Sequence, residues 1–172
     1  MSVLWHYKNT PGRQAHAPSD WPSGSTLPRS AERPTLVMLA HPHCPCTRAT
    51  IAELARLMTD AAGRVDAHVL FLKPSDMEEG WERTDLWHRA GSIAGVRVVS
   101  DIDGREAARF GATVSGQALL YDRTGRLVFR GGITGARGHE GDNLGRRQLA
   151  SLIRTGNATA RESRVFGCSL VN

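Results

Sequence analysis

From Pro34 onward, apolar runs alternate with segments whose apolar residues are spaced as on one face of a helix. The run Thr35 to Ala40 predicts a buried strand. The next segment carries apolar residues at the i, i+3, i+4 and i+7 positions, namely Ile51, Leu54, Ala55 and Met58. A helix is therefore predicted over about 45–62, with Gly63 as its C-terminal cap.

The same alternation continues along the chain. Strands are predicted at about 66–72, 96–100, 117–121 and 127–130, and helices at about 84–90, 105–110 and 143–154. The short Gly-containing loop Asp122 to Arg126 indicates a hairpin between the last two strands. Alternating strands and helices favour parallel pairing, and the hairpin adds an antiparallel pair. The pattern thus predicts an α/β fold with a mixed sheet covered by helices.

Two thiols lie where the first strand meets the first helix, in His41-Pro42-His43-Cys44-Pro45-Cys46. The first turn of a helix has amide N–H groups without partners and the positive end of the helix dipole. Such a position lowers a cysteine pKa from about 8.5 toward 7 and makes the thiol a nucleophile. Pro45 suits a first helical turn, where its missing N–H costs nothing. The pattern favours dithiol chemistry over inert core cysteines or a metal site with the two histidines.

Composition narrows the function classes. The 172 residues suffice for one domain with a hydrophobic core that needs no disulfide staples. Three cysteines indicate a working pair plus one, not a disulfide scaffold. The net charge is +5, but the arginines are scattered over separate elements without a basic stripe, which argues against nucleic-acid binding. No apolar stretch approaches the roughly 20 residues of a membrane span, and Met1-Ser2-Val3-Leu4-Trp5 lacks the pattern of a signal peptide.

Three parts of the chain are expected to differ in character. Residues 1–33 form a Pro/Ser/Gly-rich arm or linker, residues 34–155 the folded domain, and residues 156–172 a tail that carries Cys168. An arm of this composition is typical of a spacer behind a membrane anchor. The arm thus favours an extracytoplasmic location, with membrane contact only through an anchor outside this sequence, and the resemblance described below implies that this location is the periplasm.

Three stretches resemble proteins of the thioredoxin-fold superfamily. Met38 to Cys46 is similar to the thioredoxin active-site turn, and Val99 to Gly111 to a strand, turn and helix of peroxiredoxins and membrane-tethered periplasmic thiol-disulfide reductases. Leu119 to Leu127 is similar to the hairpin of those groups. The nearest likeness is to the RedB group of thioredoxin-domain proteins, through the His-Pro-x-Cys-Pro-Cys turn, residues 132–135 and 138–143, and Phe166-Gly167-Cys168.

The resemblance implies a thioredoxin-like three-layer fold, a mixed sheet with helices on both faces. It also implies that Cys44 is the attacking thiol and Cys46 the resolving one. Two features depart from the family pattern: one residue instead of two separates the cysteines, and Thr113 to Gln117 lacks the family's cis-proline. The missing ring leaves space beside the thiols for a metal ion or a peroxide, although His41 stands where peroxiredoxins have a threonine.

Other candidate site residues surround the two thiols in the predicted topology. His41 and His43 would stabilise a thiolate or protonate a leaving thiol, unless they are exposed loop histidines without a role. The glycine-rich loop 131–143 is predicted to flank the thiols. Its candidates are Arg137 for an anionic group, His139 as a base or ligand, and Glu140 or Asp142 to orient His139. The alternative is a glycine-rich turn in which Asp142 or Asn143 caps the last helix.

The tail is long enough to return to the thiols. About a dozen extended residues span roughly 35 to 40 Å at about 3.3 Å each. A last helix of twelve residues is only about 18 Å long. Cys168 is accordingly predicted as an auxiliary thiol that pairs with Cys44 or Cys46 or binds a metal, the alternative being a free thiol in a frayed end.

The sequence therefore predicts a thiol-disulfide oxidoreductase that acts on protein or small-molecule thiols and disulfides and exchanges electrons with a redox partner protein. No dinucleotide or phosphate-binding motif is present, so no organic cofactor is expected. The first alternative is a copper or zinc carrier that uses Cys44, Cys46 and His43. Ligands one residue apart crowd a tetrahedral site, so only weak metal affinity is expected there. A thiol peroxidase is the third hypothesis.

Overall fold

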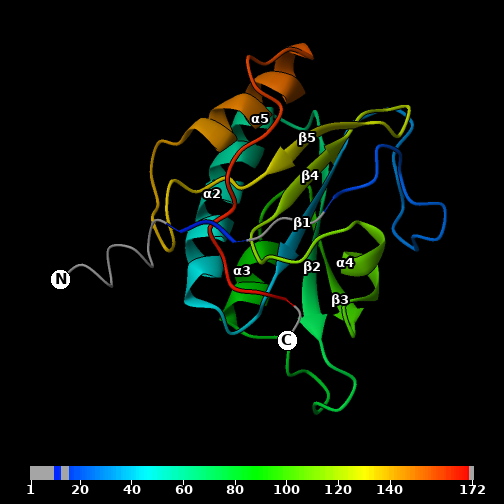
Figure 1. The fold of residues 1–172 in the computed structure, drawn as a ribbon, viewed down its shortest axis with the longest axis vertical. Helices are drawn as coiled ribbons and strands as arrows, with labels where there is room; N and C mark the ends of the chain where they lie inside the picture. Colours follow the sequence, from blue (N-terminus) through cyan, green and yellow to red (C-terminus); the bar gives the residue numbers. More distant parts are fainter. Residues whose placement is uncertain (1–9, 13–15, 171–172) are drawn as a thin grey trace.

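Five strands form one mixed sheet in the computed structural model, which describes residues 10–12 and 16–170. The strands are β1 (Thr35–Ala40), β2 (Asp66–Lys73), β3 (Val96–Ile102), β4 (Ala118–Tyr121) and β5 (Leu127–Gly131) (Figure 1). Their order is β3-β2-β1-β4-β5; β1, β2 and β3 pair in parallel, and β4 and β5 are antiparallel to their neighbours. The predicted mixed sheet with a closing hairpin is confirmed.

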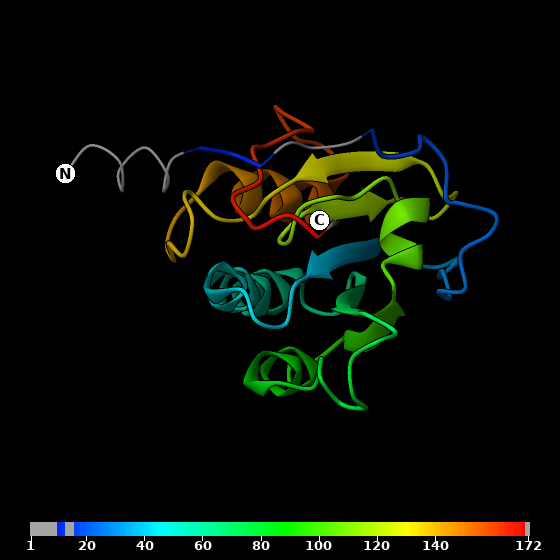
Figure 2. The ribbon, with the colours of Figure 1, turned by 60° about the horizontal axis from the view of Figure 1, so that its bottom comes forward.

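Helices cover both faces of this sheet, as predicted. They are α2 (Pro45–Ala61), α3 (Asp85–Gly91), α4 (Arg105–Arg109) and α5 (Leu144–Thr155). Figure 2 shows α4 apart from the other three helices, on the far side of the strands. None of the helices in the described part of the chain has the length and apolar character that crossing a membrane would need.

The central strand β1 divides the core in two because successive strand side chains point to opposite faces. Leu36 and Met38 pack in the cluster formed with α2, α3 and α5, whereas Val37 and Leu39 pack in the cluster on the α4 side. All four are almost completely buried. An apolar run without alternation is typical of a strand covered on both faces. Strand β1 therefore lies between the two parts of the core.

Helix α2 begins at the predicted proline, and its C-cap lies one residue before the expected Gly63. Pro45 is the first helical residue, and Ala62, with φ 48°, forms the left-handed C-cap. Gly63 follows with φ 77°, so the chain leaves the helix through two left-handed residues. The apolar spacing thus located the helix, and the turn chemistry at its end differs only by one position.

Part of the sequence before β1 packs against the α4 face. Trp21 contacts the rings of Phe110 and Tyr121 edge-on, with centroids 5.0 and 5.3 Å away. The buried carboxylate of Glu106 accepts hydrogen bonds from Ser25 Oγ at 2.6 Å and from the Thr26 backbone N–H at 3.1 Å. Residues 1–9 and 13–15 of the predicted arm and residues 171–172 of the tail lie outside the described residues.

Replacing Glu106 with Gln should weaken this attachment. Burial acts to raise the pKa of Glu106, but the hydrogen bonds from Ser25 and Thr26 outweigh it and lower the pKa. The carboxylate therefore contributes stability above its unfolded-state pKa and loses that contribution as the pH falls through its lowered value. We expect Glu106→Gln to cost about 1–3 kcal/mol at pH 7 in urea unfolding, with a smaller difference from wild type in acid.

Glu162→Gln is the matched control. The Glu162 side chain is 66% exposed and pairs with Arg130 at 2.7 Å, so its loss should cost less than about 1 kcal/mol. Equal effects of the two substitutions would show that Glu106 does not anchor the segment before β1.

Candidate active site

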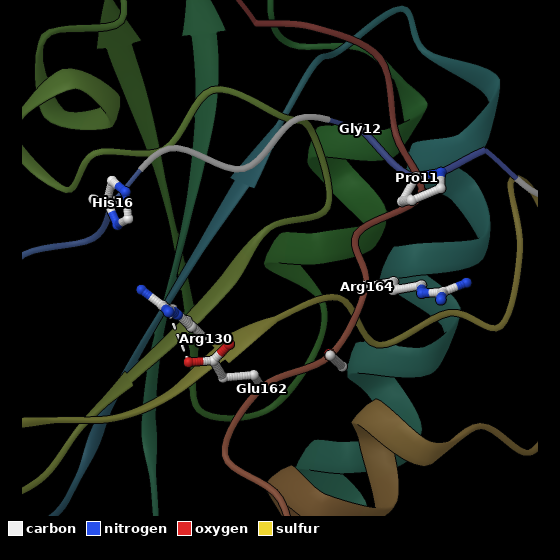
Figure 3. A pocket seen from close by; sticks show the side chains of 7 residues that line it. Pro11, Gly12, His16, Arg130, Glu162 and Arg164 are labelled. Carbon is white, nitrogen blue, oxygen red and sulfur yellow. Dashed lines mark hydrogen bonds and ion pairs between the residues drawn. The ribbon is translucent and has the colours of Figure 1, made fainter.

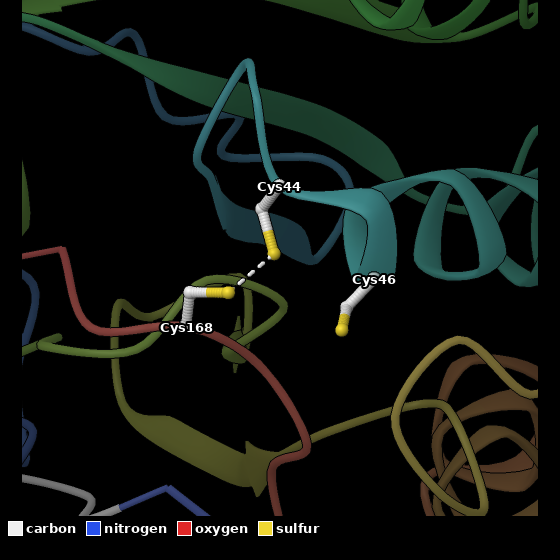
Figure 4. A group of neighbouring side chains, drawn as sticks. All are labelled: Cys44, Cys46 and Cys168. Atoms are coloured by element: carbon white, nitrogen blue, oxygen red, sulfur yellow. Dashed lines mark hydrogen bonds between the residues drawn. The ribbon is translucent and has the colours of Figure 1, made fainter. Parts of the chain in front are cut away.

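Three cysteines from distant parts of the sequence meet at the end of β1. The Sγ atoms of Cys44 and Cys168 are 2.7 Å apart. All three sulfurs, including that of Cys46, lie within 4.8 Å of one another, and Figure 4 shows the side chains converging from α2 and from the tail. All three are free cysteines. A disulfide is about 2.05 Å long, so Cys44 and Cys168 are unbonded thiols within reach of bond formation.

The strand-to-helix junction fixes Cys44. It is the N-cap of α2 in an extended conformation, its carbonyl accepts from the Thr47 N–H at 3.0 Å, and its own N–H donates to the His41 carbonyl at 3.2 Å. The Thr47 hydroxyl donates to the same His41 carbonyl at 3.0 Å. The turn between β1 and α2 is therefore closed by its own backbone, and Cys44 is held at the positive end of the helix with only 3% of its surface exposed.

The tail reaches Cys44 because it pairs with the segment that precedes β4. The Ser115 N–H donates to the Cys168 carbonyl at 2.9 Å, and the Leu170 N–H donates to the Thr113 carbonyl at 2.9 Å. Val114 and Ser169 form the antiparallel bridge between these bonds. The buried side chain of Leu170 belongs to the α4-side core. Figure 1 shows the tail returning from α5 toward the middle of the molecule.

Gly167 allows this approach. A Cβ at this position would lie 1.7 Å from the Ser115 carbonyl oxygen. The backbone of the tail therefore lies closer to Ser115 than any side chain would permit. The Arg137 guanidinium donates to the Gly167 carbonyl on the same stretch. These contacts place the next residue, Cys168, over Cys44.

Ser115 links all three parts of the site. Its hydroxyl accepts from the His41 N–H at 2.9 Å and lies 3.0 Å from the Thr47 hydroxyl, while its backbone N–H holds Cys168. The sequence analysis did not identify Ser115 or Thr47 as site residues. Thr47 lies three residues after Cys44, a position that contacts the strand-to-helix turn, but no local signal marks Ser115.

The three thiols differ in acidity because each is partly buried and interacts with the other cysteines. Burial acts to raise the pKa of Cys44, but hydrogen bonds from the Cys168 thiol and from the backbone of Cys46 and Cys168 outweigh it and lower the pKa. Burial and the hydrogen bond to Cys44 raise the pKa of Cys168 to about 12. Cys44 is therefore the more acidic thiol of the pair, and Cys168 the less acidic one.

Arg137 is the cation beside the other two sulfurs. Burial and the charge on Cys44 raise the pKa of Cys46, while the Arg137 guanidinium opposes that rise through its charge and a hydrogen bond. The same charge opposes the rise at Cys168. Arg137, which the sequence analysis assigned to an anionic group, thus lies where it favours negative charge on the thiols.

The two histidines of the turn have other partners. His43 Nε2 lies 3.1 Å from the Trp81 carbonyl, and its ring stacks at a tilt on Trp81 with centroids 4.5 Å apart. His41 Nδ1 accepts from the His43 N–H at 3.2 Å. Burial and the neighbouring His43 lower the pKa of His41, which favours its neutral form. Among the described residues, the group of potential metal ligands here contains only the three cysteines.

Loop 131–143 is held against α2 by a buried carboxylate. Glu53 Oε1 accepts from the Gly141 N–H at 2.7 Å, and Asn143, the N-cap of α5, donates to the Ile133 carbonyl at 2.8 Å. Glu140 pairs with Arg56 of α2 at 3.2 Å. His139 closes a backbone turn to Ala136 at 3.2 Å. Glu140 is therefore engaged in an ion pair with α2, while Arg137 is the loop residue with a contact to the thiols.

A separate cavity of about 490 Å³ opens between the first described residues and the tail (Figure 3). Its lining contains no cysteine: Pro11, Gly12, His16, Arg130, Glu162, Ser163 and Arg164. Arg130 and Glu162 form an ion pair within it. The three thiols thus lie outside the lining of this cavity.

Comparison with known proteins identifies the fold. No family model and no curated protein match the sequence. A solved structure of a hypothetical protein from Sinorhizobium meliloti 1021 is 20% identical with a TM-score of 0.63, covering 94% of this chain and 93% of its own. A secreted Mycobacterium tuberculosis disulfide oxidoreductase homologous to E. coli DsbE is 13% identical with a TM-score of 0.50, covering 72% and 81%. The exposed lipoprotein thioredoxin of Streptococcus pneumoniae TIGR4 is 12% identical with a TM-score of 0.51, covering 72% and 85%.

The fold is thioredoxin-like. The fold implied by the resemblance noted from the sequence is confirmed. In this thioredoxin-like fold, Ser115 and its neighbours occupy the stretch where the sequence resemblance leads one to expect a cis-proline, and the tail pairs with that stretch. The edge beside the Cys44 sulfur is thus covered by the chain's own Cys168.

Gly167→Ala should separate the tail from this thioredoxin-like site. The new methyl group would overlap the Ser115 carbonyl, so residues 167–170 must shift. We expect at least a ~10-fold slower formation of a Cys44–Cys168 disulfide, because exchange depends on access of one sulfur to the other. The rate of disulfide formation is measured by quenching samples with an alkylating reagent at timed intervals and mapping their peptides.

Gly24→Ala provides the control, since a Cβ there has its nearest neighbour 3.6 Å away, at Arg109 Nε. Its disulfide should form at the wild-type rate. An unchanged rate in Gly167→Ala would mean that the close approach to Ser115 does not position Cys168.

Proposed function

We propose that this protein is a thiol-disulfide oxidoreductase in which Cys44 is the attacking thiolate and Cys168 the resolving thiol. The observation that carries the proposal is the 2.7 Å approach of the Cys168 sulfur to Cys44 at the N-terminus of α2. A thiolate next to a protonated thiol is the arrangement that precedes disulfide exchange. The solved M. tuberculosis structure with the same fold, a disulfide oxidoreductase by its title, supports this class of reaction.

The first step is attack on a substrate disulfide. The Cys44 thiolate forms a bond to one substrate sulfur, the substrate S–S bond breaks, and the departing thiolate takes a proton from solvent or from the Cys168 thiol. The Cys44 sulfur must become accessible for this step, because it is buried beneath Cys168. Rotation of the partly exposed Cys168 side chain opens that path.

The second step is resolution of the mixed disulfide. Once Cys44 is bonded to substrate it carries no negative charge, so the hydrogen bond and the charge that raise the pKa of Cys168 are gone. Arg137 then favours the Cys168 thiolate, which attacks the Cys44 sulfur and expels the second substrate thiolate. The balance is one substrate disulfide reduced to two thiols and two protein thiols oxidised to one disulfide.

Cys168 suits the role of resolving thiol better than Cys46, the residue to which the sequence resemblance assigned that role. The sulfurs of Cys44 and Cys46 lie 4.0 Å apart, against 2.7 Å for Cys44 and Cys168. A Cys44–Cys46 disulfide would also close a small ring across Pro45, which strains the preferred dihedral angle near 90°.

A reducing or oxidising partner must return the protein to its starting state. A dithiol protein or a small thiol reduces the Cys44–Cys168 disulfide, and a disulfide of the same class runs the cycle in the opposite direction. The secreted M. tuberculosis protein and the exposed pneumococcal lipoprotein support an extracytoplasmic setting for this cycle.

Serine substitution of each cysteine tests the assignment. Cys44→Ser should lower insulin reduction at least ~100-fold because the attacking sulfur is lost. Cys168→Ser should lower it about 10-fold and accumulate a mixed disulfide on Cys44, since the slower Cys46 must resolve it. Cys46→Ser should have the smallest effect. Full activity in Cys44→Ser would refute the assignment of Cys44 as the nucleophile. A mixed disulfide that accumulates in Cys46→Ser but not in Cys168→Ser would show that Cys46, and not Cys168, is the resolving thiol.

The oxidised protein should contain mainly the Cys44–Cys168 bridge. Treatment with a mild thiol oxidant, alkylation of the remaining thiol and peptide mass spectrometry determine the pairing. We expect Cys46 to be alkylated in most molecules, because its sulfur is the more distant partner of Cys44. A predominant Cys44–Cys46 bridge with alkylated Cys168 would contradict the proposed resolving thiol.

A further inference from the structure

We propose that Cys44, Cys46 and Cys168 together form a three-thiolate site for one Cu(I) ion. The three sulfurs come from the first turn of α2 and from the tail, and they lie within 4.8 Å of one another (Figure 4). The site uses the sulfurs of the proposed exchange reaction, but binding of Cu(I) itself moves no electrons. It replaces the set of Cys44, Cys46 and His43 that the sequence suggested.

The spacing of the sulfurs fits a trigonal site. A metal-thiolate bond of about 2.3 Å in a trigonal plane puts the sulfurs about 4.0 Å apart. The sulfurs of Cys44 and Cys46 are already 4.0 Å apart. The 2.7 Å approach of Cys168 to Cys44 must widen, through a rotation of the Cys168 side chain that leaves its backbone paired with Ser115. The crowding expected for a tetrahedral site does not arise, because Cys168 supplies a third ligand from the opposite side.

The ligand set selects a soft ion of low coordination number. Thiolates favour Cu(I) and Zn(II) among biological metals, but Zn(II) in structural sites takes four ligands. In the described part of the chain no histidine, aspartate or glutamate joins the three cysteines as a fourth ligand. The His43 ring instead contacts Trp81, through its Nε2 atom to the Trp81 carbonyl and through the two rings. Three sulfurs without a fourth ligand therefore match Cu(I) better than Zn(II).

Charge is accommodated by the surroundings. Binding of Cu(I) to three thiols releases up to three protons and leaves a complex with a net charge down to −2. The positive end of α2 and the Arg137 guanidinium lie beside the sulfurs. Arg137 also holds the tail through the Gly167 carbonyl. The cation that favours the thiolates thus also keeps the third ligand in place.

Anaerobic titration of the fully reduced protein with Cu(I) tests the site. The probe is Cu(I) held by a chromogenic chelator of known affinity, and ultraviolet thiolate-to-copper charge transfer reports the ligands. We expect one Cu(I) per chain, bound tightly enough to be withdrawn from the chelator, and no comparable withdrawal of Zn(II) from a zinc chelator. Failure to withdraw Cu(I), or tighter binding of Zn(II), would overturn the proposal.

Variants separate this site from the alternatives. Cys168→Ser and Cys46→Ser should each lower Cu(I) affinity at least ~100-fold, while His43→Ala should leave it within about 3-fold of wild type. Near-ultraviolet circular dichroism verifies that each variant is folded. Affinity unchanged in Cys168→Ser, or lost in His43→Ala, would refute the three-thiolate set. Insulin reduction is also measured on the metal-free wild-type protein, so a wild-type protein that reduces insulin but does not withdraw Cu(I) from the chelator overturns only this proposal.

Discussion

The antiparallel pairing of the tail with residues 113–115 is the contact on which the chemistry of this protein depends. Two backbone hydrogen bonds, at Ser115 and Leu170, fix the tail, and the absence of a side chain at Gly167 lets it approach the Ser115 carbonyl. Without this pairing, Cys44 would have a single thiol neighbour, two positions away in sequence. With it, a thiol 124 positions away becomes the nearest sulfur.

The same pairing sets the electrostatics of the site. Three thiols in a partly buried space cannot all ionise, because each negative charge opposes the next. The helix N-terminus and the surrounding hydrogen bonds favour the charge on Cys44, and the raised pKa of Cys46 and Cys168 is the counterpart of that preference. In the proposed exchange, a disulfide at Cys44 removes this preference, and the next thiol can ionise. A single charge that moves among three sulfurs would then order the steps of that exchange.

Local signals in the sequence predicted most of the fold and the first two thiols. The uninterrupted apolar run of β1, the helical spacing after Pro45 and the hairpin at Gly125 are properties of neighbouring residues, and all three elements are confirmed. Ser115 has no such signal, because its role depends on a strand end, a helix turn and a tail meeting in space. The segment at Trp21, whose composition resembles a spacer, packs on Phe110 through an equally non-local contact.

Disulfide formation and copper binding draw on the same sulfurs, so each state excludes the other. A Cys44–Cys168 disulfide removes two of three ligands, and a bound Cu(I) removes both the nucleophile and its resolving thiol. Metal binding to the reduced form alone stabilises that form by mass action. Copper would therefore shift the thiol-disulfide equilibrium toward the reduced protein, and an oxidant would release the metal. The arrangement that makes Cys168 a resolving thiol is then also what couples the redox state of this fold to a soft metal ion.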